Sequence, residues 1–328
     1  MKRPMMLTSS IMIGIICCIT ALQPAHAQNN RTEWFKEAKF GVFIHFLGGG
    51  PEWSEKVNAF DVDQLAKQIV QTKAGYLIFT LGQNSGYYCS PNATYEKYAG
   101  YKIGERCPAR DLPMELADKL LQSRIKMMLY LPSRSPQTDK QAMSGLHDVH
   151  QSKPAPQEFT KRWSDVIREW SLRYKEKAAG WWFDGAYNSE GWDDISKPNS
   201  WKTWAAACRA GNPDSILAFN RGANLEIAFI KQTDEQDYTA GERTLFDATP
   251  KTYPSPKPLQ WHLLSFLGSN WGKKDGPTNS NQYMIDYIKK VNTMGGVVSI
   301  DVGINSDGSI YQPHLDQLMA IGKALNAK

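Results

Sequence analysis

Polar side chains stand directly after several apolar stretches of this sequence. Asp184 is the first polar residue after the run AAGWWF, and Gly185 behind it lets the chain turn away sharply. His45 follows FGVFI, and Asn220 follows SILAF, in the same manner. A carboxylate in such a place can act as a nucleophile or as a general acid/base. The alternative is that Asp184 only caps a helix or anchors a loop.

Other hydrogen-bonding and indole side chains lie at or just beyond the ends of apolar runs. They are Gln83, Asn84, Tyr130, Ser133, Arg221, Trp261 and His262, and three tryptophans stand at expected loop positions, Trp53, Trp192 and Trp271. Sugar hydroxyls need directional donors and acceptors, while the C–H faces of a sugar pack on aromatic rings. Taken singly, each of these residues has a structural explanation. Together they favour a saccharide-binding pocket.

Strand-like and helix-like segments alternate along the chain and would position these residues. We expect strands at 40–46, 76–81, 125–131, 180–184, 215–220, 234–238, 259–264 and 295–301, and helices at 61–74, 113–124, 157–177, 199–210, 280–294 and 312–326. About eight strands, most followed by a helix, predict an α/β fold, a (β/α)8 TIM-like barrel with its site at the carboxyl ends of the strands. A doubly wound open sheet is the alternative, but no glycine-rich phosphate loop follows the first strand.

The N-terminal segment has the features of an export signal. A basic start is followed by an apolar run at 11–22 and by Ala25-His26-Ala27, which has the form of a secretory cleavage site. The run is too short to span a bilayer. We therefore expect residues 1–27 to be a signal peptide and residues 28–328 to be one catalytic domain, secreted or periplasmic, with no membrane contact after cleavage. An uncleaved anchor is the alternative.

Charge and composition limit the partners that the chain could have. Its 328 residues are 41% hydrophobic and 22% charged, as in a globular protein. The net charge of +5 falls to +3 when Lys2 and Arg3 leave with the signal peptide, which is too little to favour nucleic acid. No CxxC, HExxH or His/carboxylate cluster predicts a metal site, and no cofactor is expected. The oligomeric state is left open.

Three cysteines remain after the signal peptide, namely Cys89, Cys107 and Cys208. They do not form a disulfide framework by their spacing. If one pair closes in an oxidising compartment, a disulfide between the first two is favoured, because only a short loop-like segment separates them.

Six segments carry a further pattern. The most specific are GWWFDGAY (180–187) and VNTMGGVVSIDVGINSDGSI (291–310), and the others are WFKEAKFGVFIHF (34–46), AFNRG (218–222), DYTAGE (237–242) and SFLGSNWG (265–272). In this order they resemble the catalytic domain of glycoside hydrolase family 29, the retaining α-L-fucosidases. The resemblance covers essentially the whole mature chain and implies an oligosaccharide or glycoconjugate substrate. The family's usual C-terminal β-sandwich is expected to be absent, since the chain ends soon after the last expected helix.

The resemblance also implies roles for individual residues. Asp184 would be the nucleophile, His45 a donor to sugar hydroxyls, and Trp271 part of the wall near the sugar's methyl group. A retaining enzyme needs a second, protonated carboxylate at ~5–5.5 Å. Burial of the nucleophile among aromatic residues disfavours its charged form, so His45, Asn220 or Arg221 are expected to donate hydrogen bonds to it.

The resemblance makes Glu242 the leading candidate for the acid/base. It occupies the place of the Glu in the family's D-Y/F-x-T-P-E stretch, and Glu190 and Glu235 are reserve candidates. The alternative for Glu242 is a loop carboxylate paired with Arg243. An acid/base needs a pKa kept high by an apolar wall or a neighbouring negative charge.

One departure from the family bears on the substrate. Where the family usually has Lys-His-His-Asp-Gly-Phe, this chain has GQNSGYY (82–88), so Gln83 and Asn84 replace two histidines. Amides still bind hydroxyls, but with another pattern of donors and acceptors. The sequence predicts an exported retaining exo-glycosidase for an α-L-fucoside or a similar sugar; the alternatives are a glycosidase for another sugar and a non-catalytic carbohydrate-binding relative. The predicted sugar-binding residues are His45, Gln83, Asn84, Tyr130, Asn220, Arg221, Trp261 and Trp271.

Overall fold

A parallel β-sheet forms the centre of the protein in the computed structural model, which describes residues 31–149, 155–187 and 190–327. Its seven strands are β1 (Phe40–Ile44), β2 (Tyr76–Thr80), β3 (Lys126–Pro132), β4 (Ala178–Asp184), β5 (Ile216–Phe219), β6 (His262–Phe266) and β7 (Val297–Val302). Their order across the sheet is β5-β4-β3-β2-β1-β7-β6. The expected strands are therefore present in this part of the chain, except the one at 234–238.

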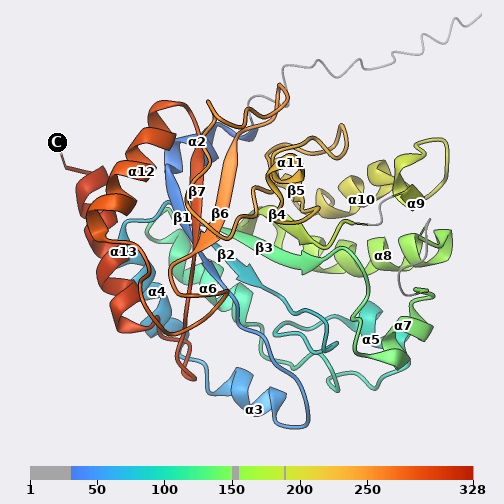
Figure 1. Cartoon of the computed structure of the whole chain (residues 1–328). Helices are drawn as coiled ribbons and strands as arrows, with labels where there is room; N and C mark the ends of the chain where they lie inside the picture. The colour runs from blue at the N-terminus through green and yellow to red at the C-terminus, as the bar shows by residue number, and fades with distance from the viewer. Residues whose placement is uncertain (1–30, 150–154, 188–189, 328) are drawn as a thin grey trace, which may run out of the picture.

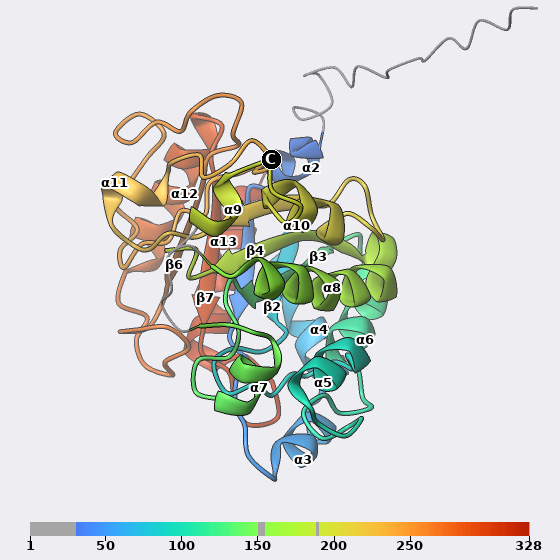
Figure 2. The ribbon, with the colours of Figure 1, turned by 90° about the vertical axis from the view of Figure 1, so that its right-hand side faces the viewer.

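Helices cover the outer face of this sheet (Figure 1). The longer ones are α4 (Val62–Thr72), α6 (Leu112–Leu121), α8 (Gln157–Tyr174), α10 (Trp201–Cys208), α12 (Asn281–Thr293) and α13 (Gln312–Leu325). The shorter ones are α2 (Glu33–Ala38), α3 (Trp53–Asn58), α5 (Ala93–Ala99), α7 (Lys140–Gly145), α9 (Glu190–Asp193), α11 (Leu225–Ala228) and the 3₁₀ turn η1 (Lys175–Lys177). Helices α3, α5 and α7 follow β1, β2 and β3, so their loops build up the carboxyl-end face, and Figure 2 shows α5 and α7 together below α8.

Capping residues explain where several of these helices begin. The side chains of Asp61, Asp111 and Ser280 accept hydrogen bonds from backbone N–H groups in the first turns of α4, α6 and α12. Within the described residues, no helix is long and apolar enough to cross a membrane.

Each strand divides its side chains between two hydrophobic cores. In β4, Trp181 and Phe183 face the helices, where their rings stack, while Trp182 faces the inside of the curled sheet. Asp184 shares the inner face with Trp182, because side chains of a strand alternate with a period of two. The same alternation brings Tyr130 of β3 to the inside. Phe35 of α2 packs against the inner core as well.

The sheet is a half-barrel rather than the closed eight-stranded barrel that the sequence predicted. Residues 237–242 lie where an eighth strand would stand, but in place of a continuous ladder they form isolated parallel bridges, Tyr238 with Gln260 just before β6 and Glu242 with Leu264 of β6. Gly241 has a φ of +64°, which no regular strand adopts, and a Cβ there would lie 1.9 Å from the His262 carbonyl oxygen. The close approach of backbone to backbone therefore interrupts the strand.

The cysteines do not form the disulfide that was favoured. Cys89, Cys107 and Cys208 are all buried with free thiols. The Cys89 thiol donates a hydrogen bond to the carbonyl oxygen of Thr80 instead. Burial raises the pKa of all three thiols, which keeps them protonated.

Candidate active site

Inward-facing side chains at the carboxyl ends of the strands meet around one cavity of about 300 Å³. Its polar lining consists of His45, Gln83, Tyr130, Asp184 and Glu242, and its apolar lining of Phe43, Leu47, Trp182, Leu264 and Trp271. The strand ends supply these residues because parallel strands place their carboxyl ends at one edge of the sheet. The cavity thus joins residues from nearly 230 positions of the chain (43–271).

Asp184 receives one hydrogen bond on each carboxylate oxygen. The Tyr130 hydroxyl donates to Oδ2 at 2.7 Å, and Asn220 Nδ2 donates to Oδ1 at 2.9 Å. Burial first, and then the charge of Asp184, raises the pKa of the Tyr130 hydroxyl, which stays a donor. These two bonds fix the orientation of the carboxylate at the end of β4.

Glu242 is the second carboxylate of the cavity and is held by the same amide. Asn220 Nδ2 donates to Glu242 Oε2 at 2.5 Å. Burial raises the pKa of Glu242, and the negative charge of Asp184 raises it further, while the bond from Asn220 and the nearby His45 act in the opposite direction. A raised pKa keeps a proton on this carboxyl at higher pH, as a general acid requires.

His45 is oriented by a buried carboxylate from β7. Its Nδ1 lies 2.6 Å from Oδ1 of Asp301, whose Oδ2 accepts from the backbone N–H of Gly272 at 2.7 Å. Asp301 is fully buried. It fixes both the imidazole ring and the loop that carries Trp271, whose ring lies 5.7 Å from that of His45.

Aromatic rings form the inner wall of the cavity. Trp182 stacks on Tyr130 with ring centroids 5.6 Å apart, and its Nε1 donates to the carbonyl oxygen of Ala240 at 3.0 Å. That bond also anchors the irregular segment that carries Glu242. Directional polar groups on one side and rings on the other are the arrangement of a sugar site.

Comparison with known proteins agrees with this arrangement. Residues 50–328 match the family described as alpha-L-fucosidase. The chain belongs to the alpha-L-fucosidase family. It is therefore a member of a glycoside hydrolase family, and the resemblance seen in the sequence is confirmed. No curated protein matches the chain.

Solved structures share the fold at low sequence identity. The endo-fucoidan hydrolase MfFcnA4 of glycoside hydrolase family 107 superposes with a TM-score of 0.72 at 15% identity, over 91% of this chain and 54% of MfFcnA4, so this chain spans about half of its length. Alpha-L-fucosidase isoenzyme 1 from Paenibacillus thiaminolyticus gives 0.65 at 20% identity, over 92% and 76%. A GH29 alpha-L-fucosidase from Bacteroides thetaiotaomicron, trapped as a covalent intermediate, gives 0.63 at 18%, over 90% and 74%.

Most residues predicted for the site of this alpha-L-fucosidase family member lie together. His45, Gln83, Tyr130, Asp184, Glu242 and Trp271 line the cavity. Asn220 donates a hydrogen bond to each of the two carboxylates, Asp184 and Glu242. The alternative that Glu242 pairs with Arg243 is not what the structure has, because the Arg243 guanidinium pairs with Asp247 at 3.0 Å.

Three predicted sugar-binding residues lie elsewhere. Trp261 precedes β6 and faces the outer core, where its ring stacks on Phe229 and its Nε1 donates to the carbonyl oxygen of Tyr253. Asn84 is exposed and Arg221 is partly exposed, and neither lines the cavity. Asn84 follows Gln83 and Arg221 follows Asn220, and both of these neighbours point toward the site. Side chains at successive positions diverge, so Asn84 and Arg221 point away from it.

The other candidates are also accounted for. Trp53 and Trp192 are buried in helices rather than exposed on loops. Glu235 pairs with Arg209 at 3.0 Å and does not line the cavity. The side chain of Glu190 lies outside the described residues. No group of three or more potential metal ligands occurs in the part of the chain that the structure describes.

Asp301 is a residue of the site that was not predicted, although its place in the sequence indicates it. Asp301 ends the apolar run VVSI, as Asp184 ends its own run, and both face inward at the same edge of the sheet. The register pairs it with Phe43 on the neighbouring strand β1, two positions before His45. Two polar residues on adjacent strand ends predict a contact.

Proposed function

We propose that this protein is a retaining exo-glycosidase that removes an α-L-fucosyl residue, with Asp184 as nucleophile and Glu242 as general acid/base. The observation that carries the proposal is the single amide of Asn220, whose Nδ2 lies 2.9 Å from Asp184 and 2.5 Å from Glu242. The two oxygens cannot be further apart than these two distances laid end to end. That limit suits the ~5–5.5 Å of retaining enzymes and not the ~6.5–9.5 Å of inverting ones.

The reaction would proceed in two displacements. Asp184 attacks the anomeric carbon while the bond to the leaving oxygen breaks and Glu242 gives that oxygen its proton, which leaves a glycosyl ester on Asp184. Glu242, now ionised, then takes a proton from water, and the resulting hydroxide attacks the anomeric carbon and releases Asp184. The covalent intermediate of the Bacteroides thetaiotaomicron fucosidase supports this route.

The lining of the cavity supports a single 6-deoxy sugar as the group that is removed. Its volume of about 300 Å³ is at the lower end for ligand pockets, which suits one ring and an exo-acting enzyme. His45 supplies polar contacts, whereas Trp271 and Leu264 offer an apolar surface for C–H groups and a methyl.

Hydrolysis of a panel of aryl α- and β-glycosides, with the α-L-fucoside included, tests the proposal. We expect release from the α-L-fucoside, with the α-anomer of the free sugar appearing first in the NMR spectrum, and no release by Asp184→Ala. First appearance of the β-anomer would contradict a retaining mechanism. Release from another glycoside would show that the enzyme acts on a different sugar. If no glycoside of the panel is hydrolysed but calorimetry shows binding of an oligosaccharide, the protein is a non-catalytic binding protein.

We further propose that the protein is exported, because residues 1–27 have the charge, apolar run and cleavage site of a signal peptide. N-terminal sequencing of protein from the periplasm or medium should then begin at Gln28. Protein that stays in the cytoplasm with Met1 intact would contradict export.

A further inference from the structure

We propose that Gln83 is a positioning residue that holds the Tyr130 hydroxyl in the orientation that donates to Asp184. The loop that carries Gln83 is held in turn by a cluster of four side chains, which we call the clamp: Tyr87, Tyr101, Arg106 and Asp139. The inference rests on the proposed role of Asp184 as nucleophile. It gives Gln83 a task other than binding a sugar hydroxyl, which is the task that its place in the sequence suggested.

The direction of the hydrogen bonds follows from the groups themselves. Gln83 Nε2 lies 2.5 Å from the Tyr130 hydroxyl oxygen, and an amide nitrogen can only donate. An ionised Asp184 can only accept, and its Oδ2 lies 2.7 Å from the same hydroxyl. The one hydrogen of Tyr130 must therefore point to Asp184, and its lone pair to Gln83. A chain of this kind strengthens the last donor, because successive hydrogen bonds polarise one another.

An amide is better suited to this task than the histidine usual in the family. Imidazole nitrogens donate or accept according to tautomer, and the ring titrates near neutral pH. The amide of Gln83 donates at every pH. It therefore keeps the Tyr130 hydroxyl in one orientation whatever the protonation of the rest of the cavity.

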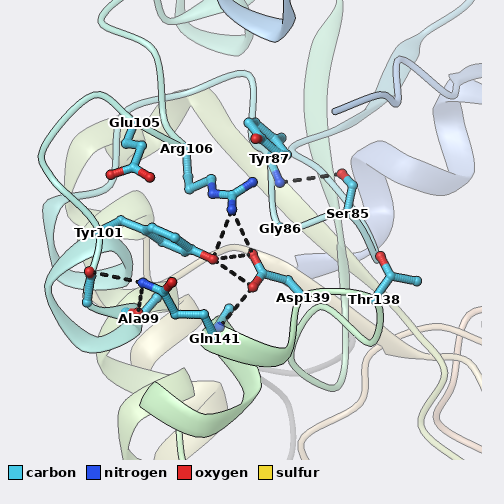
Figure 3. Close-up of polar contacts among 12 residues, drawn as sticks. Ser85, Gly86, Tyr87, Ala99, Tyr101, Glu105, Arg106, Thr138, Asp139 and Gln141 are labelled. Carbon is cyan, nitrogen blue, oxygen red and sulfur yellow. Dashed lines mark hydrogen bonds and ion pairs between the residues drawn. The ribbon is translucent and has the colours of Figure 1, made fainter. Parts of the chain in front are cut away.

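The clamp contacts the loop 82–88 at Tyr87 and is drawn in Figure 3. The Arg106 guanidinium stacks between the rings of Tyr87 and Tyr101, 4.1 and 4.3 Å from their centroids, and donates to the Tyr101 hydroxyl at 3.0 Å. That hydroxyl donates to Asp139 at 2.7 Å, and Asp139 caps α7 by accepting from the backbone N–H of Ala142 at 3.0 Å. The clamp thus joins the loop to the element that follows β3.

Further bonds tie the same loop to its neighbours. The Ser85 hydroxyl donates to the carbonyl oxygen of Gly48, in the loop after β1. The carbonyl oxygen of Asn84 accepts from both the backbone N–H and the hydroxyl of Thr138, at 3.1 and 2.7 Å. Gln83 is adjacent to these anchored residues, so its backbone has little freedom and its amide stays on Tyr130.

Covalent labelling by 2-fluoro-fucosyl fluoride separates positioning from sugar binding. Gln83→Met keeps the length of the side chain and removes the donor. We expect its kinact to fall about tenfold with KI within about twofold of wild type, since the nucleophile is weakened and the sugar contacts remain. Gln83→His, which can still donate, should recover much of the rate, and Gln71→Met on the exposed face of α4 is the matched control.

An effect of Gln83→Met on KI instead of kinact would overturn the inference. A raised KI with unchanged kinact would make Gln83 a sugar contact, and no change in either constant would remove its role altogether. Failure of the wild type to be labelled at Asp184 would instead reject the proposed function itself, so the two failures are distinguishable.

A double-mutant cycle tests the clamp. Arg106→Met should lower kinact severalfold, and the double variant with Gln83→Met should be no slower than Gln83→Met alone, because both act through one hydroxyl. Arg168→Met, on the exposed surface of α8, is the control. If Arg106→Met does not fold, as judged by circular dichroism, Tyr101→Phe serves in its place. Additive effects in the cycle would show that the clamp does not act through Gln83.

Discussion

The two carboxylates of the cavity stand on backbones of different kinds. Asp184 ends β4, which pairs with β3 on one side and β5 on the other. Glu242 ends a segment that touches β6 through isolated bridges and contains Gly241 in a left-handed conformation. Regular pairing fixes the first carboxylate, whereas the second depends on a few particular bonds. The proposed nucleophile and its acid are therefore positioned by separate parts of the backbone, and Asn220 donates a hydrogen bond to each of them.

Replacing Asp184, the carboxylate on the regular strand β4, should lower activity the most. Asp184→Asn keeps the shape of the side chain and removes the attacking charge, so we expect kcat/KM to fall by about 10⁴-fold or more, with the melting temperature close to that of wild type. Steady-state kinetics and thermal circular dichroism measure both. Residual activity within tenfold of wild type would show that another group attacks the sugar.

Replacing Glu242, the carboxylate on the irregular segment 237–242, should lower activity less, and by an amount that depends on the leaving group of the substrate. Glu242→Gln should slow cleavage of substrates with poor leaving groups about 10²–10⁴-fold, and of an activated aryl fucoside much less, because an activated group leaves without a proton. Azide should speed up Glu242→Ala and give a glycosyl azide. Glu235→Gln, at a carboxylate that pairs with Arg209, is the matched control. Equal slowing of good and poor leaving groups would remove Glu242 from the acid role.

The backbone of the irregular segment can be broken directly. Gly241→Ala places a Cβ 1.9 Å from the His262 carbonyl oxygen, and we expect a loss of about 3 kcal/mol or more in the free energy of unfolding. Gly104→Ala is the control, since Gly104 also has a positive φ but open space around it, and should cost about 1–2 kcal/mol. Urea unfolding measures both. Equal losses would mean that the close approach to β6 contributes nothing.

The smallest effect concerns pH. Folding raises the pKa of Glu242 through burial and through the charge of Asp184. The stability that this proton contributes is therefore full below the unfolded pKa and is lost as pH rises through the higher folded pKa. Glu242→Gln never ionises, so its melting temperature should exceed that of wild type at pH 7, and the difference should shrink in acid. Glu176→Gln, at an exposed carboxylate, should show no such trend. A difference that is independent of pH would contradict the account.

The same contrast explains what could be predicted from the sequence. The six longer helices and the seven strands follow from periodicity, because buried strands are continuous apolar runs and amphipathic helices repeat their apolar residues every three or four positions. Asp184 could be recognised as a candidate site residue because it is the first polar residue after such a run. Glu242 could not be found in this way, since its segment has no period, and it was identified only through the resemblance to the family.

The errors have physical reasons that concern register and spacing. The seventh strand was expected to begin at 259, but β6 begins at His262, and a strand's faces alternate, so the inward position of Trp261 was wrong. The sixth expected strand, at 234–238, does not form, and the irregular segment 237–242 stands in its place. Asp301 was not among the predicted site residues, although it follows the run VVSI as Asp184 follows WWF.

The most direct measurement is peptide mapping after reaction of the wild type with 2-fluoro-fucosyl fluoride. We expect one fluorofucosyl group, on the peptide that contains Asp184, and no such group in Asp184→Asn. Hydrolysis of fucosides without any trapped ester, or an ester on a different carboxylate, would contradict the claim that Asp184 is the nucleophile.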